Sequence, residues 1–277
     1  MPTQAGLDIL RCPRDGERLV AATDGPARAP TSGWRCAGGH PINADEGIVR
    51  LVWPERMMSR DAHMNRMYER LAPFYDWNER LGGRLFGVHT IGERAAIVDR
   101  LGLRPGMRVL EVSPGPGVYQ KLLADRIGPS GNLAELDLSL AMLRACARRA
   151  RRAGNRLDPL LVQANASYLP FADDSFDAVF HFGGVKLFSE PGRALDELVR
   201  VAKPDAVVAW GDEGFGAGAP TGWRRRALQR MNPGFAQPVP PLPEGVSDVT
   251  EHEVMNGCAW LVVARKAAVG SERAAAL

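Results

Sequence analysis

The chain has 277 residues, of which 45% are hydrophobic, enough to bury the core of one α/β domain of ordinary size with a small appendage. A formal net charge of +3 is small for this length and argues against dependence on a large basic surface. No run of about eighteen apolar residues and no basic-then-apolar start occurs, so we expect a cytoplasmic protein without a membrane span. Four scattered cysteines argue against a disulfide framework.

Residues 1–55 are rich in proline and glycine, and we predict that they form a separate small unit. Two short motifs in this unit offer metal ligands, Cys12-Pro-Arg-Asp15 and Cys36-Ala-Gly-Gly-His40. Sulfur, imidazole and carboxylate groups on two tight turns can converge on one zinc ion. Alternatively, the metal has been lost and the unit is held by packing alone. The residues available for that packing are Leu10, Leu19, Trp34, Ile42 and Val49.

Residues 56–102 are predicted to form a helical lid. Apolar residues recur at helical spacing in two stretches, and the segment APFYDW at 72–77 lies between them. Proline and aromatic residues suit a lid that excludes water from a reaction. Burial in the core is an equally good explanation of Phe74, Tyr75 and Trp77.

Residues 103–117, LRPGMRVLEVSPGPG, join a buried strand to a glycine-rich turn, and the chain is organised around them. The strand is predicted at 108–112, with Glu111 near its carboxyl end. Gly115 and Gly117 allow the backbone to bend sharply and to approach a ligand closely. A helix predicted at 118–127 follows at once, so its free N–H groups face the same crevice.

The strand predicted at 133–138 places Asp137 twenty residues after Gly117. A carboxylate at this offset can accept hydrogen bonds from the ribose hydroxyls of an adenosine. A dinucleotide fingerprint would require a third glycine at position 120, where this chain has Gln120. The pattern therefore favours an adenosine ligand and disfavours a nicotinamide or flavin dinucleotide.

From residue 103 onward strands and helices alternate, which predicts a parallel sheet with helices on both faces. The dipeptide Asn256-Gly257 separates the last two strands and is a strong hairpin signal. A proline-rich excursion at 220–245 contains a basic helix at 223–231. The strands are predicted at 108–112, 133–138, 160–164, 176–182, 206–212, 247–255 and 258–265.

Several segments in order resemble the class I S-adenosyl-L-methionine (SAM) dependent methyltransferases, in the branch similar to ubiquinone/menaquinone methyltransferases. These segments are APFYDW at 72–77, VLEVSPGPG at 109–117, LDLSLAML at 136–143, ANASYLPFADDSFDAV at 164–179 and ELVRVAKPDAVV at 197–208. The resemblance covers residues 68–266. It implies a Rossmann-like α/β fold over 103–270, with a seven-stranded, mostly parallel sheet, an antiparallel last strand, and a tail at 271–277.

The first unit resembles the zinc ribbon of the 23S rRNA guanine-N1 methyltransferases, in which CPxC is followed by CxxxH. Asp15 replaces the second cysteine of that pattern. Carboxylates can bind zinc, but this donor set is less usual in a structural site. The resemblance implies a zinc ion whose ligands are Cys12, Asp15, Cys36 and His40.

The larger resemblance implies SAM as the cofactor. Glu111 and the backbone from Ser113 to Gly117 would bind the methionine end, and Ser113 stands where the family commonly has glycine. Asp137 would bind the ribose, and Leu138 would pack on the adenine. Asn165 would accept a hydrogen bond from the amino group of the adenine. The implied cofactor residues are Tyr75, Glu111, Ser113, Gly115, Gly117, Asp137, Leu138, Asn165, Ala166 and His181.

Methyl transfer from a sulfonium needs alignment and desolvation, so no catalytic residue is obligatory. Where the acceptor must lose a proton, His181 at the end of strand 176–182 is the best-placed base. Glu213, after the fifth strand, could orient an acceptor or bind a cation. Pocket lining or helix capping is the alternative for both residues.

We therefore expect a SAM-dependent methyltransferase that acts on a small organic acceptor, for example a bacterial secondary metabolite. A ribosomal RNA base methyltransferase is one alternative, suggested by the ribbon and by arginine-rich stretches. A non-catalytic SAM-binding or interaction protein is another, suggested by Ser113 and Asn165. The sequence does not fix the acceptor or the oligomeric state.

Overall fold

The structure is a computed structural model that describes residues 8–21, 34–72, 91–153, 157–217, 221–231, 235 and 237–268. The aromatic residues predicted for the lid, Phe74, Tyr75 and Trp77, lie outside the described residues. None of the helices within the described ranges is long and apolar enough to span a bilayer.

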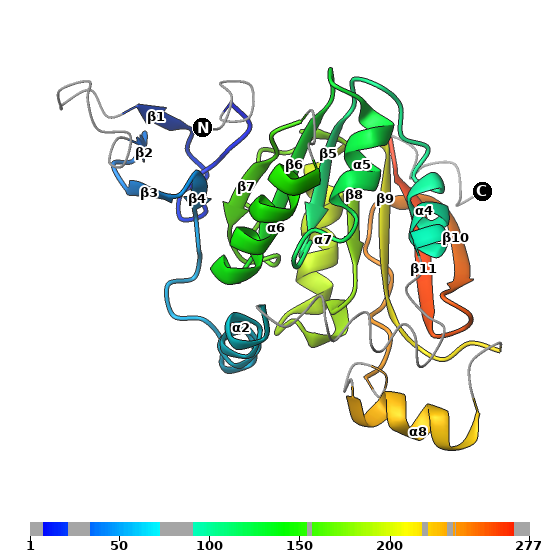
Figure 1. The fold of residues 1–277 in the computed structure, drawn as a ribbon. Helices are drawn as coiled ribbons and strands as arrows, with labels where there is room; N and C mark the ends of the chain where they lie inside the picture. The colour runs from blue at the N-terminus through cyan, green and yellow to red at the C-terminus, as the bar shows by residue number, and fades with distance from the viewer. Residues whose placement is uncertain are drawn as a thin grey trace, which may run out of the picture.

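One sheet runs through the described chain, from the blue strands on the left of Figure 1 to the orange and red strands on the right. It has 11 strands. In spatial order these are β1 (Leu19–Ala21), β2 (Trp34–Cys36), β3 (Pro41–Asp45), β4 (Ile48–Arg50), β7 (Leu160–Gln163), β6 (Asn132–Asp137), β5 (Arg108–Val112), β8 (Phe176–Phe182), β9 (Ala202–Glu213), β11 (Ala259–Lys266) and β10 (Val246–Val254).

The seven strands from β7 to β10 confirm the predicted Rossmann-like sheet. Strands β7, β6, β5, β8 and β9 are parallel, and β11 runs antiparallel to β9. The turn between β10 and β11 contains Asn256 and Gly257 with φ of +52° and +75°, the left-handed conformations that this dipeptide favours. The final hairpin is therefore confirmed as well. Strand β9 begins at Ala202, four residues before the predicted start at 206.

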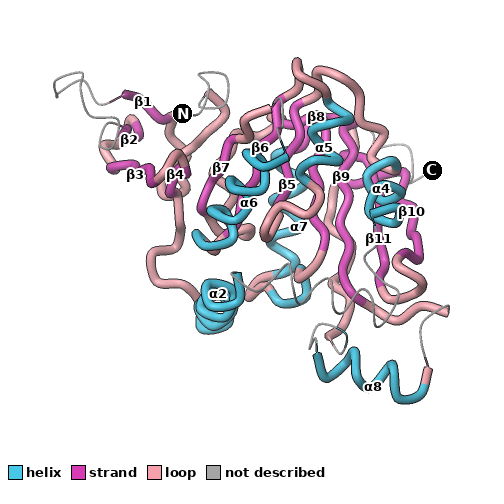
Figure 2. The backbone as a smooth tube through the Cα atoms, viewed as in Figure 1, coloured by secondary structure: helices cyan, strands magenta, loops and turns pink. Residues whose placement is uncertain are grey.

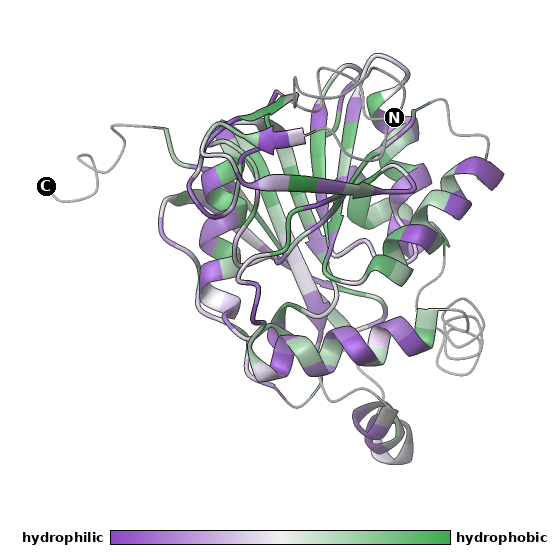
Figure 3. Cartoon of the chain, turned by 90° about the vertical axis from the view of Figure 1, so that its left-hand side faces the viewer, coloured by the Kyte–Doolittle hydropathy of each residue, from purple (hydrophilic) through white to green (hydrophobic). Residues whose placement is uncertain are grey.

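Helices cover both faces of the sheet (Figures 1 and 2). Helices α4 (Ile91–Asp99), α5 (Gln120–Ile127) and α6 (Leu140–Ala153) lie on one face and α7 (Pro191–Val201) on the other. Side chains alternate along each strand, so Val109 packs with α4 and α5 while Leu110 packs with α7. The hydrophobic colour of Figure 3 accordingly concentrates on the central strands.

Helix α2 (Ser59–Leu71) lies below the sheet in Figure 1, at the edge where β5, β6 and β8 end. A role of this helix as a lid stays a prediction. The short helix η2 (Val185–Leu187) follows β8 at the same edge, and α8 (Gly222–Met231) is the predicted basic helix.

The sequence predicted that the first unit is separate. In the structure β4 pairs in parallel with β7, so the unit extends the sheet of the larger domain. Without β4, β7 would present an open edge of unpaired backbone groups. Of the residues predicted to hold this unit together, Leu10, Ile42 and Val49 are buried in the α7-side core, and Leu19 and Trp34 pack against it. The unit thus shares its core with the larger domain.

Candidate functional site

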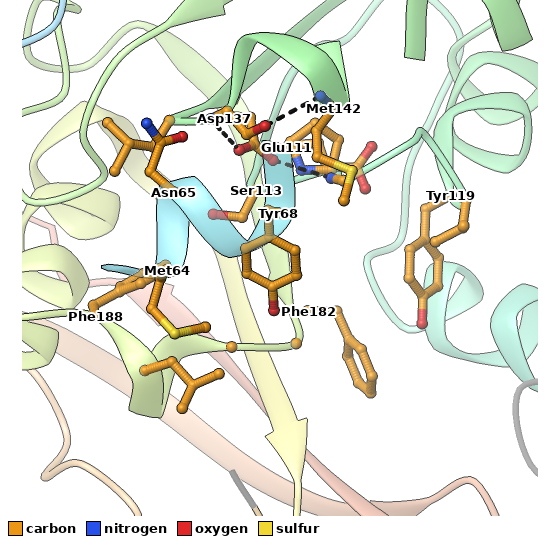
Figure 4. Close-up of a pocket in the computed structure, with 18 of the residues that line it drawn as sticks. Met64, Asn65, Tyr68, Glu111, Ser113, Tyr119, Asp137, Met142, Phe182 and Phe188 are labelled. Atoms are coloured by element: carbon orange, nitrogen blue, oxygen red, sulfur yellow. Dashed lines mark hydrogen bonds between the residues drawn. The ribbon is translucent and has the colours of Figure 1, made fainter. Parts of the chain in front are cut away.

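A pocket opens between helix α2 and the carboxyl ends of the parallel strands. The space between its walls is about 1110 Å³, part of which is open to solvent. Figure 4 shows Tyr68, from α2, in the middle of the pocket between Ser113 and Phe182. The lining includes these predicted residues: Glu111, Ser113, Gly115, Asp137, Leu138 and Glu213. This edge is where open α/β sheets bind ligands.

The glycine turn forms one wall of the pocket. Ser113 has a φ of +56°, a left-handed conformation that is least strained for glycine. Gly115 and Gly117 are also left-handed, with φ of +56° and +81°. A Cβ on Gly115 would meet no described atom within 4 Å, whereas one on Gly117 would lie 2.7 Å from Cys146 Sγ. Gly115 therefore gives space to a ligand, and Gly117 gives space to helix α6.

Gly117→Ala is expected to lower the free energy of unfolding by about 2 to 4 kcal/mol, because a left-handed alanine is strained and its Cβ overlaps Cys146. Urea denaturation measures this loss. Gly115→Ala is the matched control, with the same backbone strain and no overlap, and should lose about 1 to 2 kcal/mol. Equal losses in the two variants would contradict the packing argument.

Asp137 lies at the base of the pocket, at the end of β6. Its Oδ2 accepts a hydrogen bond from the Gly115 N–H at 3.2 Å, and its Oδ1 accepts one from the Ser139 N–H at 2.8 Å. Burial raises the pKa of Asp137 to about 7, and these two backbone bonds oppose that shift. Asp137 therefore joins the glycine turn to the strand that carries it, and it titrates close to neutral pH.

Two buried carboxyl groups lie side by side behind the turn. Glu111 on β5 is paired in register with Glu135 on β6, and both side chains are buried. Glu135 accepts hydrogen bonds from Gln120 Nε2 at 2.6 Å and from the Cys146 thiol at 3.1 Å. Burial raises the pKa of both carboxyl groups, to about 7 for Glu135, and proximity to Glu135 raises the pKa of Glu111 further. The pair therefore retains a proton well above the usual range of a glutamate.

Glu135→Gln is expected to raise the free energy of unfolding at pH 8 by about 2 kcal/mol. Because the folded pKa lies above that of the unfolded chain, the wild type loses stability as pH rises from about 4.5 to 7. The amide still accepts from Gln120 and removes this loss. Urea midpoints at pH 5 and pH 8 measure this change in stability. Asp125→Asn, at an exposed position of α5, is the control. An unchanged dependence on pH in Glu135→Gln would contradict the assignment.

Helix α2 supplies pocket residues that the sequence analysis did not identify. Asp61, Met64, Asn65 and Tyr68 all line the pocket. Their spacing of three, four and seven residues is that of one helix face, and this spacing could have revealed them. Burial raises the pKa of Tyr68, and the negative charge of the nearby Glu213 carboxylate is the second cause that raises it. The phenol of Tyr68 is therefore neutral.

Asn165 and Ala166 lie beside the pocket and are not among the described residues that line it. Both are buried. The Asn165 side chain accepts a hydrogen bond from the Ser167 N–H at 3.0 Å and donates one to Asp61 Oδ2 at 3.2 Å. Its side-chain oxygen and amide thus both have partners within the protein. Direct contact of Asn165 with a ligand stays a prediction.

His181 does not reach the pocket, in contrast to the sequence prediction. Neighbouring residues of a strand point to opposite faces, so Phe182 lines the pocket and His181 is buried behind it. Its Nδ1 lies 2.9 Å from the Val112 carbonyl oxygen, and burial lowers the pKa of its ring. The imidazole is neutral and lies against Phe188. A role as general base therefore has no support from its position.

Glu213 lines the pocket, while its neighbour Asp212 is not among the described lining residues. Asp212 accepts backbone N–H bonds from Gly184, Lys186 and Glu213 at 2.8 to 3.0 Å. Burial raises the pKa of Glu213 well above its ordinary value, and Asp212 raises it further. The raised pKa favours the protonated form of Glu213, which can donate a hydrogen bond into the pocket.

The four predicted metal ligands come together in the first unit. One ligand atom from each of Cys12, Asp15, Cys36 and His40 lies within 4.8 Å of the others. His40 Nδ1 is 2.9 Å from Asp15 Oδ2, 3.3 Å from Cys36 Sγ and 3.5 Å from Cys12 Sγ. Zinc bonds of roughly 2.0 to 2.3 Å in a tetrahedron place ligand atoms at similar separations. The donor set and its size therefore fit a zinc ion.

The amino-acid sequence of residues 110–210 matches the family model described as a methyltransferase domain. Among curated proteins, the chain is 32% identical over 145 residues to a ubiquinone/menaquinone biosynthesis C-methyltransferase, UbiE, from Hahella chejuensis, covering 52% of this chain and 57% of that protein. It is 38% identical to a demethylmenaquinone methyltransferase from Renibacterium salmoninarum, covering 50% and 53%. The chain thus spans a little over half the length of these relatives.

Solved structures show the same fold at low sequence identity. A Haemonchus contortus phosphoethanolamine N-methyltransferase 2 in complex with SAM matches with a TM-score of 0.56 and 16% identity, covering 85% of this chain and 63% of that chain. The [4+2]-cyclase SpnF matches with a TM-score of 0.51 and 18% identity, covering 74% and 95%. Because one of these proteins is named a cyclase, the fold alone does not define the reaction.

Proposed function

Because residues 110–210 form a class I SAM-dependent methyltransferase domain, we propose that this protein transfers a methyl group from SAM to a small organic acceptor of the quinone type. The observation that carries the proposal is the pocket, in which Asp137 and the glycine turn face the same space as Tyr68 and Glu213. SAM supplies the electrophilic methyl group when bound. The residues of the chain bind and orient the two reactants and exclude water.

The inner part of the pocket suits SAM. Asp137 offers acceptor oxygens for the two ribose hydroxyls, and Leu138 and Met142 offer apolar surface for the adenine. Ser113 to Gly115 bring backbone groups to the methionine end at the approach to helix α5. Glu111, which also lines the pocket, can face the amino group of the methionine.

The outer part of the pocket suits an acceptor with ring oxygens. Tyr68 carries a neutral phenol, and the raised pKa of Glu213 favours its protonated form. A quinone or quinol oxygen can accept a hydrogen bond from either group. Phe182 and Phe188 add aromatic surface for a flat ring. No histidine is among the described lining residues, and a reaction that depends on alignment does not require one.

The position of two arginines favours a small acceptor over RNA. Arg144 pairs with Asp45 at 2.8 Å and with Glu46 at 3.1 Å, which ties α6 to the first unit. Arg149 donates to the Pro116 carbonyl oxygen at 2.8 Å. Both side chains of this arginine-rich helix therefore have structural partners.

The test is to incubate the protein with SAM carrying a deuterated methyl group, a short-chain demethylmenaquinol and, separately, ribosomal RNA. Mass spectrometry then identifies the labelled product. Labelled menaquinol is expected. Label in RNA alone would establish the RNA alternative, and SAM binding without transfer to either acceptor would support a non-catalytic protein.

Glu213→Gln is expected to lower the rate of transfer at least about tenfold, because the amide is a weaker hydrogen-bond donor than a carboxylic acid and orients the acceptor oxygen less tightly. Affinity for S-adenosylhomocysteine should stay unchanged, since Glu213 lies at the acceptor end. Calorimetry and initial rates separate the two effects. Unchanged rates in Glu213→Gln would remove this residue from the acceptor site.

We also propose that the first unit binds zinc through Cys12, Asp15, Cys36 and His40. Gly38 supports this proposal, because a Cβ at this position would overlap the Asp15 carboxylate. The His40 N–H also donates to Cys36 Sγ at 3.3 Å, as expected where a thiolate is held in a tight turn. The ion would have a structural role, since no position in a closed four-ligand site is left for a substrate.

A further inference from the structure

The inference concerns Asp61, a carboxylate of helix α2 that lines the pocket and is only 6% exposed. Its Oδ1 accepts from the Ser189 N–H at 2.9 Å, and its own N–H donates to Ser189 Oγ at 3.2 Å. Its Oδ2 accepts from Asn165 Nδ2 at 3.2 Å. A carboxylate has about four acceptor sites, so both oxygens can still accept from a ligand.

The order of strands gives the pocket a direction. Asp61 contacts Asn165, which follows β7, Asp137 ends β6, Ser113 follows β5, and Glu213 ends β9. These strands are neighbours in the sheet in the order β7, β6, β5, β8, β9. If the ribose of SAM binds at Asp137 and the methyl group points toward Glu213, the adenine lies on the β7 side. That is the side of Asp61.

Adenine carries one exposed hydrogen-bond donor group, its exocyclic amine, which needs an acceptor in a buried site. Asn165 is poorly placed to supply it, because Asn165 is not among the described residues that line the pocket and its amide is directed at Asp61. Asp61 is the carboxylate that lines this end of the pocket among the described residues.

Resting on the proposed function, we propose that Asp61 accepts the hydrogen bond of the adenine amine and that Asn165 is a positioning residue that holds Asp61. The neutral amide at position 165 is required for this arrangement. A carboxylate there would face Asp61 at the same separation and repel it. The acceptor for adenine thus comes from the lid helix, so cofactor binding also fixes α2 over the pocket.

Helix α2 offers a matched control on its next turns. Glu69 also joins α2 to the sheet, since Glu69 Oε1 accepts from Ser139 Oγ at 2.9 Å and from the Ala141 N–H at 3.1 Å. Glu69 is not among the described residues that line the pocket. Glu69→Gln therefore weakens the attachment of the lid without changing a contact to the adenine.

The experiment compares S-adenosylhomocysteine with S-inosylhomocysteine, in which the amine is replaced by a carbonyl oxygen. Calorimetric titration is made on the wild type, Asp61→Asn, Glu69→Gln and the exchange variant Asp61→Asn/Asn165→Asp. The wild type should prefer the adenosyl ligand at least about tenfold. Asp61→Asn should lose most of this preference, and Glu69→Gln should keep it.

The exchange variant separates the two assignments. It restores an amide-to-carboxylate bond between positions 61 and 165, so its thermal midpoint should return close to that of the wild type. Its preference for the adenosyl ligand should stay lost, because the carboxylate has moved away from the pocket. A preference retained in this variant, or in Asp61→Asn, would overturn the assignment. If the wild type bound neither ligand, the proposed function itself would fail.

Discussion

Asp137→Ala should weaken the binding of S-adenosylhomocysteine at least about tenfold, which corresponds to about 1.5 kcal/mol for a charged pair of hydrogen bonds. In the proposed function the carboxylate accepts from the ribose hydroxyls, and in the structure it also fixes the glycine turn through the Gly115 N–H. Calorimetric titration of wild type and variant measures the difference. Equal affinities would show that the ligand does not lie against β6.

The same residue predicts how affinity depends on pH. With an empty pocket the pKa of Asp137 is about 7, and the ribose hydroxyls must donate to the ionised form. Affinity should therefore fall about tenfold for each pH unit below 7 and level off above it. Asp137→Asn is the control, since it still accepts hydrogen bonds and cannot ionise. A slope that persists in this variant would assign the titration to another group.

Cys36→Ser is expected to abolish stoichiometric zinc, because the three remaining donors no longer complete the tetrahedral site. Structural zinc contributes on the order of 10 kcal/mol to the folding of small isolated units. Here the shared core with β7 and α7 should limit the damage, so β1 to β3 should lose protection from hydrogen exchange while the central sheet keeps it.

Elemental analysis and hydrogen exchange on purified protein provide the measurement. Cys258→Ser is the matched control, because it removes a buried thiol that is not part of the ligand cluster. The wild type and the control should contain one equivalent of zinc. Absence of zinc from the wild type would end the metal proposal, and zinc retained by Cys36→Ser would show that the ligand set is different.

Much of the catalytic half of the chain could be predicted from local signals. The strand at 108–112, the left-handed glycines and the hairpin at Asn256-Gly257 each follow from the preferences of the residues themselves. Asp137 was found because its distance from the turn in the sequence reflects one strand-turn-helix-strand unit. Elements that depend on short-range patterns could therefore be predicted from the sequence.

Contacts between distant segments were not accessible in this way. The pairing of β4 with β7 joins residues more than a hundred positions apart, and no local pattern signals it. His181 was misplaced because the end of a strand was assigned to the pocket without deciding which face each residue occupies. Glu135 was not identified from the sequence, because its partner Gln120 lies on a different element fifteen residues earlier.

The continuity of the sheet from β1 to β10 bears on how the protein would behave if it were shortened. Removal of residues 1–55 would remove β4 and leave the backbone groups at the edge of β7 unpaired. It would also expose apolar surface of Val162 and Phe171, which β4 and Leu10 now cover. Such edges recruit other strands, so the shortened protein would self-associate and become difficult to keep in solution. The first unit therefore protects the domain that follows it from edge-to-edge association.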